Sequence, residues 1–392
     1  MTRRHTKDKE LLHVAMIEPV GGHSGMDYYD FGLCQALTKN QIQVTLYTCD
    51  ETDLPSDSGY KTKRLYKGIY GTDNKWIRGF RYIRGTMLTF WDITKKNSQI
   101  CHFHFFHVGV LELFNLLACQ FLNVKILITV HDIESLASKK STSLFAKVAY
   151  RLAHCLIVHN YVSQRELISK TGADRSKIFV IPHGSYLHAI NRKNTKFSAR
   201  SYLDLSEDAK VLLFFGQIKS VKGLDILLNA LPPVVHRYPG TILFIAGRLW
   251  KDNFEKYAKI IEDKNLGSHC RLRIEYIAKK EADNLFSAAD LLVLPYHKIY
   301  QSGVLLMGMS YGTAVLASDL DGMLEIIEDG ENGFVFPAHD SDALSQRLME
   351  LLAEPQKLQQ AADKALQLME NEYSWSVVAK KTAAAYMATL DE

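Results

Sequence analysis

Glycine and cationic residues follow neighbouring apolar runs in the second half of this chain. Gly216, Gln217 and Lys222 come after one such run, and Arg248 comes after the next. A lysine beside a glycine at the start of a helix suits a diphosphate, because its charge acts together with free N–H groups. Taken singly, Lys222 or Arg248 could be a solvated charged residue of a loop. Two cations at adjacent strand ends instead favour a phosphate site.

A Ser-Gly turn supplies a third element that favours anions. Ser302, Gly303 and Val304 open an apolar helical stretch that ends at Gly312. The dipole and the free N–H groups of a helix N-terminus both favour negative charge. The second half of the chain is therefore predicted to hold a diphosphate.

In the first half, a glycine turn and an acid follow the first apolar run. The turn contains Gly21, Gly22 and His23, and it leads to Asp27. Glycines let backbone approach a ligand closely, and helix N-terminal N–H groups would keep Asp27 ionised. The spacing differs from the GxGxxG of dinucleotide sites, which disfavours NAD. An empty turn and a simple helix cap are the alternatives.

His131 and Asp132 end another apolar run, in the sequence TVHD. A histidine at a strand end can act as an acid, a base or a hydrogen-bond donor. We predict Asp27 as a general base, with His131 as the second candidate. A purely structural hydrogen-bonding role is the alternative for His131.

Metal, cofactor and disulfide sites are not expected. His102 and His104 alternate onto one face of a strand beside His107, but no fourth ligand of suitable spacing follows. The six cysteines are scattered without a CxxC pair, which indicates a reducing compartment. The net charge of +4 argues against nucleic acid as a partner.

These residues need a scaffold that brings strand ends together. A chain of 392 residues exceeds one hydrophobic core. Twelve short apolar runs alternate with helical patterns, and a polar stretch, Tyr186–Asp208, separates six from six. The first six are Leu11–Ile17, Val44–Tyr47, Ile100–Phe105, Lys125–Val130, Cys155–Val158 and Ile178–Ile181. The others are Val211–Phe215, Thr241–Ala246, Arg271–Tyr276, Leu291–Leu294, Ala314–Ala317 and Phe334–Phe336.

Such alternation predicts an α/β fold with parallel sheets, helices on both faces and ligands at the carboxyl ends of the strands. We predict two Rossmann-like domains, residues 1–188 and 205–373, that face a central cleft. The polar stretch between them is predicted to be a linker. A C-terminal helix within 374–392 is predicted to pack back toward the first domain.

Residues 60–91 combine basic and aromatic side chains. Between Tyr60 and Gly85 there are eight Lys or Arg, one acid and six aromatics. On a helical wheel, one apolar stripe is formed by Trp76, Phe80, Ile83, Met87 and Phe90. The basic residues Lys75, Arg78, Arg81 and Arg84 spread over the other face. This pattern suits an anionic membrane surface, and a core helix with a solvated outer face is the alternative.

The chain shows no secretory signal and no run of about 20 nearly uncharged residues. We therefore expect a cytoplasmic protein that is peripheral at the inner face of the membrane.

Taken together, the motifs resemble the family-four glycosyltransferases of GT-B fold, over nearly the whole chain. The matching pieces include VHD at 130–132, RELISKTGADRSKIFVIPHG at 165–184, GQIKSVKG at 216–223 and SGVLLMGMSYGTAVLASD at 302–319. The resemblance implies that the first domain binds the acceptor and the second binds a UDP- or GDP-sugar, without metal or cofactor.

It also implies roles for single residues. Lys222 is similar to the lysine that holds the donor phosphates, and Ser302-Gly303 matches the loop whose N–H groups do likewise. His131 matches the family's cleft histidine near the transferred sugar. The implied acceptor is a glycan or lipid-linked saccharide, in the assembly of cell-surface polysaccharide or glycoconjugate.

Two departures from the family pattern stand out. Gln217 replaces an arginine, and the resemblance places the two acids of a Glu-x7-Glu signature at Ile299 and Met307. No Asp or Glu occurs anywhere in residues 295–311. Without a carboxylate at the transferred sugar, we expect inversion at the anomeric carbon. A retaining transferase with an atypical donor loop and a non-catalytic GT-B subunit are the alternatives.

Overall fold

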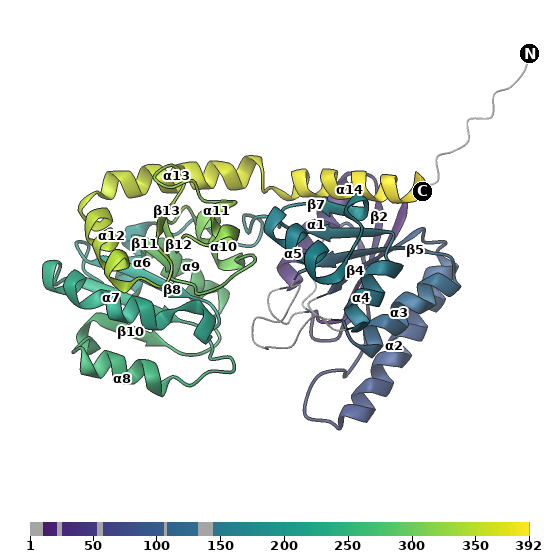
Figure 1. The fold of residues 1–392 in the computed structure, drawn as a ribbon, viewed down its shortest axis with the longest axis horizontal. Coiled ribbons are helices and arrows are strands. Elements are labelled where there is room, and N and C mark those ends of the chain that lie inside the picture. The colour runs from purple at the N-terminus through teal and green to yellow at the C-terminus, as the bar shows by residue number, and fades with distance from the viewer. Residues whose placement is uncertain (1–10, 22–25, 53–57, 106–107, 132–143, 392) are drawn as a thin grey trace, which may run out of the picture. The chain divides into compact units, whose positions relative to one another are not determined.

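The computed structural model describes residues 11–21, 26–52, 58–105, 108–131 and 144–391. They form two compact units (Figure 1). The first takes the described residues up to Gly184 and, from the far end of the chain, α14 (Trp375–Asp391). The second takes Ser185–Ser374.

The first unit is built on a seven-stranded parallel sheet with the order β3-β2-β1-β4-β5-β6-β7. Its strands are β1 (His13–Glu18), β2 (Gln43–Cys49), β3 (Lys61–Tyr66), β4 (Ile100–Phe105), β5 (Lys125–Val130), β6 (Cys155–Val158) and β7 (Ile178–Val180). Its other helices are α1 (Met26–Lys39), α2 (Lys75–Lys95), α3 (Val110–Phe121), α4 (Leu144–Leu152) and α5 (Tyr161–Thr171). The strand order reverses between β1 and β4, where open parallel sheets collect ligands.

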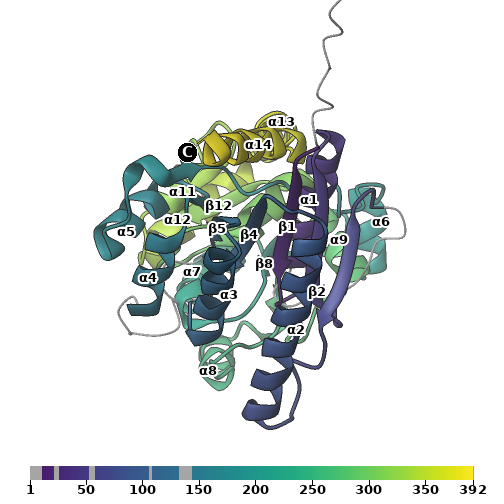
Figure 2. The same ribbon diagram turned by 90° about the vertical axis from the view of Figure 1, so that its right-hand side faces the viewer.

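The two faces of this sheet are covered by different helices. Along β1, Ala15 and Ile17 pack in one cluster with side chains of α2, α3 and α4. Val14 and Met16 pack in another cluster with side chains of α1 and α14. Figure 2 shows α2, α3 and α4 on the same face. The alternation follows from the two-residue period of a strand.

The second unit is built on a six-stranded parallel sheet with the order β10-β9-β8-β11-β12-β13. Its strands are β8 (Lys210–Phe215), β9 (Thr241–Ala246), β10 (Cys270–Arg273), β11 (Leu291–Leu294), β12 (Val315–Ser318) and β13 (Phe334–Phe336). Its helices are α6 (Lys196–Tyr202), α7 (Leu224–Arg237), α8 (Glu255–Asp263), α9 (Lys279–Ala288), α10 (Gly303–Tyr311), α11 (Asp321–Leu324), α12 (Ser341–Ala353) and α13 (Pro355–Asn371). The prediction of an α/β fold with two parallel sheets is confirmed.

The prediction that Tyr186–Asp208 is a linker is wrong, because these residues belong to the second unit and contain α6. Arg200 of α6 is buried and forms an ion pair of 2.9 Å with Asp290. Its Nε donates to the carbonyl of Ala288 at 3.2 Å. A buried guanidinium is costly unless it is paired, so these bonds fix the polar segment to the sheet.

The amphipathic stretch 75–95 forms helix α2, but the residues of its predicted apolar stripe differ in their exposure to solvent. Trp76, Phe80 and Met87 are 77%, 69% and 65% exposed, whereas Phe90 is only 6% exposed. The predicted stripe is therefore wrong at Phe90, which packs in the core. The buried residues of α2 are Tyr82, Gly85, Thr86, Thr89, Phe90 and Ile93.

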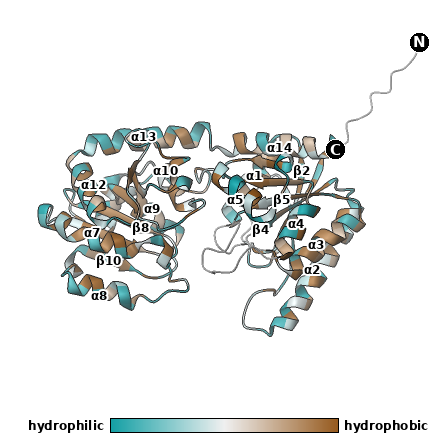
Figure 3. Cartoon of the chain, in the orientation of Figure 1, coloured by the Kyte–Doolittle hydropathy of each residue, from teal (hydrophilic) through white to brown (hydrophobic). Residues whose placement is uncertain are grey.

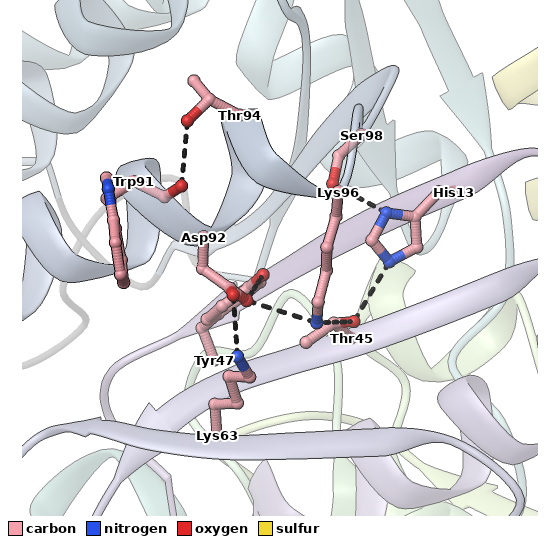
Figure 4. A network of polar contacts seen from close by, with 9 residues as sticks. All are labelled: His13, Thr45, Tyr47, Lys63, Trp91, Asp92, Thr94, Lys96 and Ser98. Carbon is pink, nitrogen blue, oxygen red and sulfur yellow. Dashed lines mark hydrogen bonds and ion pairs between the residues drawn. The ribbon is translucent and has the colours of Figure 1, made fainter.

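A polar network anchors the end of α2 to the sheet edge (Figure 4). The carboxylate of Asp92 accepts hydrogen bonds from Lys63 Nζ and Tyr47 Oη, each at 2.7 Å, and it pairs with Lys96 at 3.2 Å. Burial opposes ionisation of Asp92, but these bonds outweigh burial and lower its pKa to about 2. The network ties α2 to β2 and β3 through one side chain.

Candidate functional site

Two glycines bring the ends of β8 and β9 together in the second unit. Gly216 has φ +103° and Gly247 has φ +148°, and a Cβ at Gly247 would lie 1.8 Å from the Gly216 carbonyl oxygen. Only glycine permits both the conformation and this backbone approach. The loops that follow carry Gln217, which is half-buried, and Arg248, which is exposed.

Lys222 ends a short 3-10 turn, Ser220–Lys222, just before α7. The next residue, Gly223, has φ +64°, and a Cβ there would lie 1.8 Å from the Pro295 carbonyl oxygen. This contact holds the turn against the segment that follows β11. The Lys222 ammonium lies 3.6 Å from the ring centroid of Tyr296, a cation–π contact.

The Ser-Gly turn begins α10, as the sequence predicts. Buried Ser302 is the N-cap and accepts a hydrogen bond from the Leu305 N–H at 3.2 Å. Its hydroxyl lies 3.4 Å from Tyr296 Oη. A Cβ at Gly216 would lie 3.0 Å from Val304 Cγ2. The structure thus brings Lys222, Ser302 and Val304 to the same edge of the sheet as Gly216.

In the first unit, four histidines at the carboxyl ends of four neighbouring strands surround one tyrosine of α1; His104 lies within β4, and the other three follow β5, β6 and β7. The ring centroid of Tyr29 lies 5.1 Å from His104, 5.0 Å from His131, 5.6 Å from His159 and 4.9 Å from His183. All four rings meet Tyr29 edge-on. Aromatic rings prefer such edge contacts, so the cluster fixes the strand ends relative to α1.

His131 has imidazoles on both sides. Its Nε2 lies 3.1 Å from His104 Nδ1, and its Nδ1 lies 3.2 Å from His159 Nε2. Burial and the neighbouring histidines hold the pKa of His131 and of His104 well below 6.5, and burial lowers the pKa of His159 to about 4. These rings are neutral at physiological pH. His131 is therefore well placed to orient a group and poorly placed to accept a proton.

The glycine turn after β1 is only partly described. Gly21 is buried with φ +60°, and a Cβ there would lie 2.1 Å from Thr52 Oγ1. Gly22, His23 and Asp132 lie outside the described residues, as does His107. Asp27 lies in the first turn of α1, half-buried, and its Oδ1 accepts a hydrogen bond from the Tyr28 N–H at 3.0 Å.

His102 has a structural role. Its two ring nitrogens lie 2.7 Å from Tyr386 Oη and 2.7 Å from Thr129 Oγ1, inside the core. These contacts tie β4 to β5 and to α14. The core interpretation of this histidine fits its surroundings.

Two buried acids lie beside His104. Glu18, Asp30 and His104 each bring one ligand atom within 4.8 Å of the others, and the described residues hold no other group of three with this spacing. Burial raises the pKa of Glu18 to about 8, and burial together with Glu18 raises that of Asp30. Protonated carboxyls at this position can donate as well as accept hydrogen bonds. No sequence motif indicates the pair, because the two residues lie on different elements, Glu18 on β1 and Asp30 on α1.

Two protein-family models match the sequence of this chain. The model for Glycosyltransferase Family 4 matches residues 24–186, and the model for Glycosyl transferases group 1 matches residues 196–368. Together they take in most of both units. The chain belongs to the family-four-like glycosyltransferases of GT-B fold.

Curated relatives of this glycosyltransferase are distant. A D-inositol 3-phosphate glycosyltransferase of Nocardia farcinica is 26% identical over 244 residues, which are 60% of this chain and 53% of that relative. Another enzyme of that name, from Streptomyces scabiei, is 24% identical over 403 residues, with 95% of this chain and 88% of the relative covered. The chain spans about half the length of the first of these relatives.

Solved structures support the fold. HepE of Anabaena, in complex with UDP and glucose, has a TM-score of 0.76 at 16% identity and covers 96% of this chain and 100% of its own. Identity at this level shows a shared GT-B architecture alone.

Two further residues at this edge of the second sheet were not predicted from the sequence. Tyr296 contacts both Lys222 and Ser302. Tyr186, from the stretch predicted as linker, has its hydroxyl 2.8 Å from the position of a Cβ at Gly303, and its N–H donates to Ser310 Oγ at 3.0 Å. Tyr296 could have been predicted from its position, because it is an aromatic residue two positions after the apolar run Leu291–Leu294.

Proposed function

We propose that this protein transfers a sugar from a nucleotide-sugar to an acceptor hydroxyl. The observation that carries the proposal is the convergence of Lys222, Ser302 and Gly216 on one edge of the second sheet. Lys222 and Ser302 share Tyr296 as a neighbour, and Gly216 touches the loop that carries Arg248. A lysine, an arginine and a helix N-terminus at one strand edge suit a diphosphate.

The donor diphosphate is held by Lys222, Arg248 and the N–H groups of Ser302, Gly303 and Val304. Gly216 and Gln217 line the approach to it. Two side-chain cations can offset the charge that a leaving nucleoside diphosphate develops, so transfer of the hexosyl group proceeds without a metal ion or other cofactor. UDP in the complex of HepE supports a UDP-sugar donor, with a GDP-sugar as the second choice.

Asp27 acts as the base on the acceptor side, and His131 orients the acceptor sugar. Asp27 lies at a helix N-terminus, where an ionised carboxylate is favoured. Gly21, Gly22, His23 and Asp132 complete the acceptor side. The acceptor is a glycan or a lipid-linked saccharide, in cell-surface polysaccharide or glycoconjugate assembly.

The first unit docks on an anionic bilayer at the inner face of the membrane, through α2 and the adjoining helix α3. Large apolar side chains of both helices are exposed to solvent; they are Trp76, Ile77, Phe80, Ile83, Met87, Leu88 and Trp91 on α2, and Val110, Phe114, Leu117 and Phe121 on α3. Figure 3 shows hydrophobic residues along both helices. Of the charged residues in α2, five are basic and one is acidic. An apolar face with basic flanks is complementary to an anionic bilayer. None of the described helices is long and apolar enough to cross the bilayer.

A panel of UDP-, GDP- and TDP-sugars tests the function. We expect calorimetry to detect tight binding of one nucleotide class and donor hydrolysis to follow at a low rate. Binding without hydrolysis or transfer, in the presence of membrane-extracted acceptors, would favour the non-catalytic subunit. Absence of binding to every nucleotide would refute the proposed function.

A further inference from the structure

A cavity of about 440 Å³ opens at the carboxyl edge of the first sheet. Val20 follows β1 and Phe105 ends β4, so the cavity lies where the strand order reverses. Its other walls come from α2, from the start of α3 and from the segment before α2. This is where a parallel sheet offers its ligand site, yet no residue of the proposed donor side belongs to it.

The cavity lining carries two cationic side chains and one acid. Lys75 and Arg78 both line it, and neither forms an ion pair with another described residue. Arg78 Nε is inaccessible to solvent and has no hydrogen-bond acceptor. Arg81, one turn further along α2, is instead bound to Asp73 at 2.6 Å. Of these two arginines, Arg78 is thus the one without an ion-pair partner among the described residues.

Two helix N-termini add to this charge. The cavity takes in Lys75, the first residue of α2, and Val110, the first residue of α3. Both helices are long enough to carry a partial positive charge at this end. Glu112 is the single acid of the lining. Its Oε2 accepts a hydrogen bond from the Gly109 N–H at 2.8 Å and so caps α3.

Most of the remaining lining is apolar or aromatic, and His104 of β4 also belongs to it. Ile69, Tyr70 and Leu111 line the cavity, and Gly79 leaves room, since a Cβ there would meet no atom within 4 Å. Val110, which is exposed, also belongs to the lining. Cationic side chains in a mostly apolar cavity suit a phosphate attached to an organic group.

Resting on the proposed function, we propose that this cavity binds the phosphate group of a phosphorylated acceptor, with Arg78 and Lys75 as its principal contacts. The phosphate would hold the acceptor at the edge where Asp27 and the histidine cluster lie. A lipid-linked diphosphate saccharide and a soluble sugar phosphate share this chemistry, and the probes below distinguish them.

The test is calorimetry with saturating UDP, which keeps phosphate probes out of the donor site. Geranyl diphosphate, inorganic pyrophosphate and geraniol are titrated into the full chain. We expect geranyl diphosphate to bind more tightly than geraniol. Pyrophosphate binding as tight as that of geranyl diphosphate identifies a soluble phosphate as the source, and much weaker binding identifies a lipid-linked one.

Arg78→Gln should weaken binding of geranyl diphosphate by about tenfold or more, because it removes a charge-assisted contact. Arg84→Gln, on the same helix but outside the lining, is the matched control and should bind as the wild type does. Gly79→Leu should also block the probe, through volume instead of charge. Each variant should bind UDP normally, so a failure here stays separate from a failure of the proposed function. Equal binding of geraniol and geranyl diphosphate, or unchanged binding in Arg78→Gln, overturns the proposal.

Discussion

The ammonium of Lys222 lies 3.6 Å from the ring centroid of Tyr296. Burial raises the pKa of Tyr296, so its ring stays a neutral phenol against which the cation rests. The contact keeps a long, flexible side chain at the carboxyl end of β11. A side chain that is ordered before the ligand arrives loses less entropy on binding.

Lys222→Ala is expected to raise the dissociation constant of the nucleotide-sugar about tenfold or more, since charge-assisted hydrogen bonds contribute about 1.5–3 kcal/mol. Calorimetric titration with the best donor of the panel measures it. Lys264→Ala, which removes an exposed cation after α8, should leave binding unchanged. Donor affinity that survives in Lys222→Ala would remove this lysine from the site.

Replacing Trp76 and Phe80 together by Ser should reduce co-flotation with phosphatidylglycerol liposomes several-fold. Both side chains are largely exposed, so the change removes apolar surface from the membrane contact without opening a cavity. Tyr276→Ser, an equally exposed aromatic of the second unit, serves as control. Wild-type protein that stays at the bottom of the gradient, even at low salt, would contradict membrane docking.

Asp92 should contribute about 2 kcal/mol to the stability of the first unit at neutral pH, from its lowered pKa of about 2. A carboxylate with a depressed pKa stabilises the fold above its unfolded pKa of about 3.8, and this stability is lost as pH falls toward 2. Asp92→Asn should therefore be less stable in urea at pH 7, and the difference should shrink below pH 4. Asp263→Asn provides the surface control. A difference that does not change with pH would mean that packing, not charge, sets the effect.

The sheets could be predicted because their strands are short apolar runs with clear ends. β3 was missed because KTKRLY reads as polar. As an edge strand it pairs only with β2, and most of its side chains remain partly exposed. The prediction of a linker at Tyr186–Asp208 failed for a similar reason. In the sequence Arg200 reads as an exposed polar residue, and only the fold brings Asp290 next to it as an ion-pair partner.

The candidate sites could be predicted only where one loop holds several of their residues. Lys222 and Ser302 stand in glycine motifs that suggest phosphate by themselves. The histidine cluster needed the strand order, because His159 and His183 look like isolated residues until β6 and β7 are placed beside β5. Glu18 and Asp30 have no sequence signal, because only packing brings a strand end and a helix interior together.

The last prediction concerns the chemistry of transfer. We expect inversion at the anomeric carbon, because residues 295–311 offer no carboxylate to the transferred sugar. Inversion then needs only one base on the acceptor side. Asp27 is favoured over His131, whose two ring nitrogens already face His104 and His159.

Asp27→Asn should lower kcat by about a hundredfold or more, in line with the usual loss of a general base. His131→Ala should mainly raise KM for the acceptor, because the ring positions substrate without taking the proton. NMR of the product gives the anomeric configuration, and steady-state kinetics separates the two variants. A product that keeps the donor's configuration would overturn inversion. Near-normal turnover in Asp27→Asn would remove only the assignment of the base, and a collapse of kcat in His131→Ala would transfer that role to the histidine.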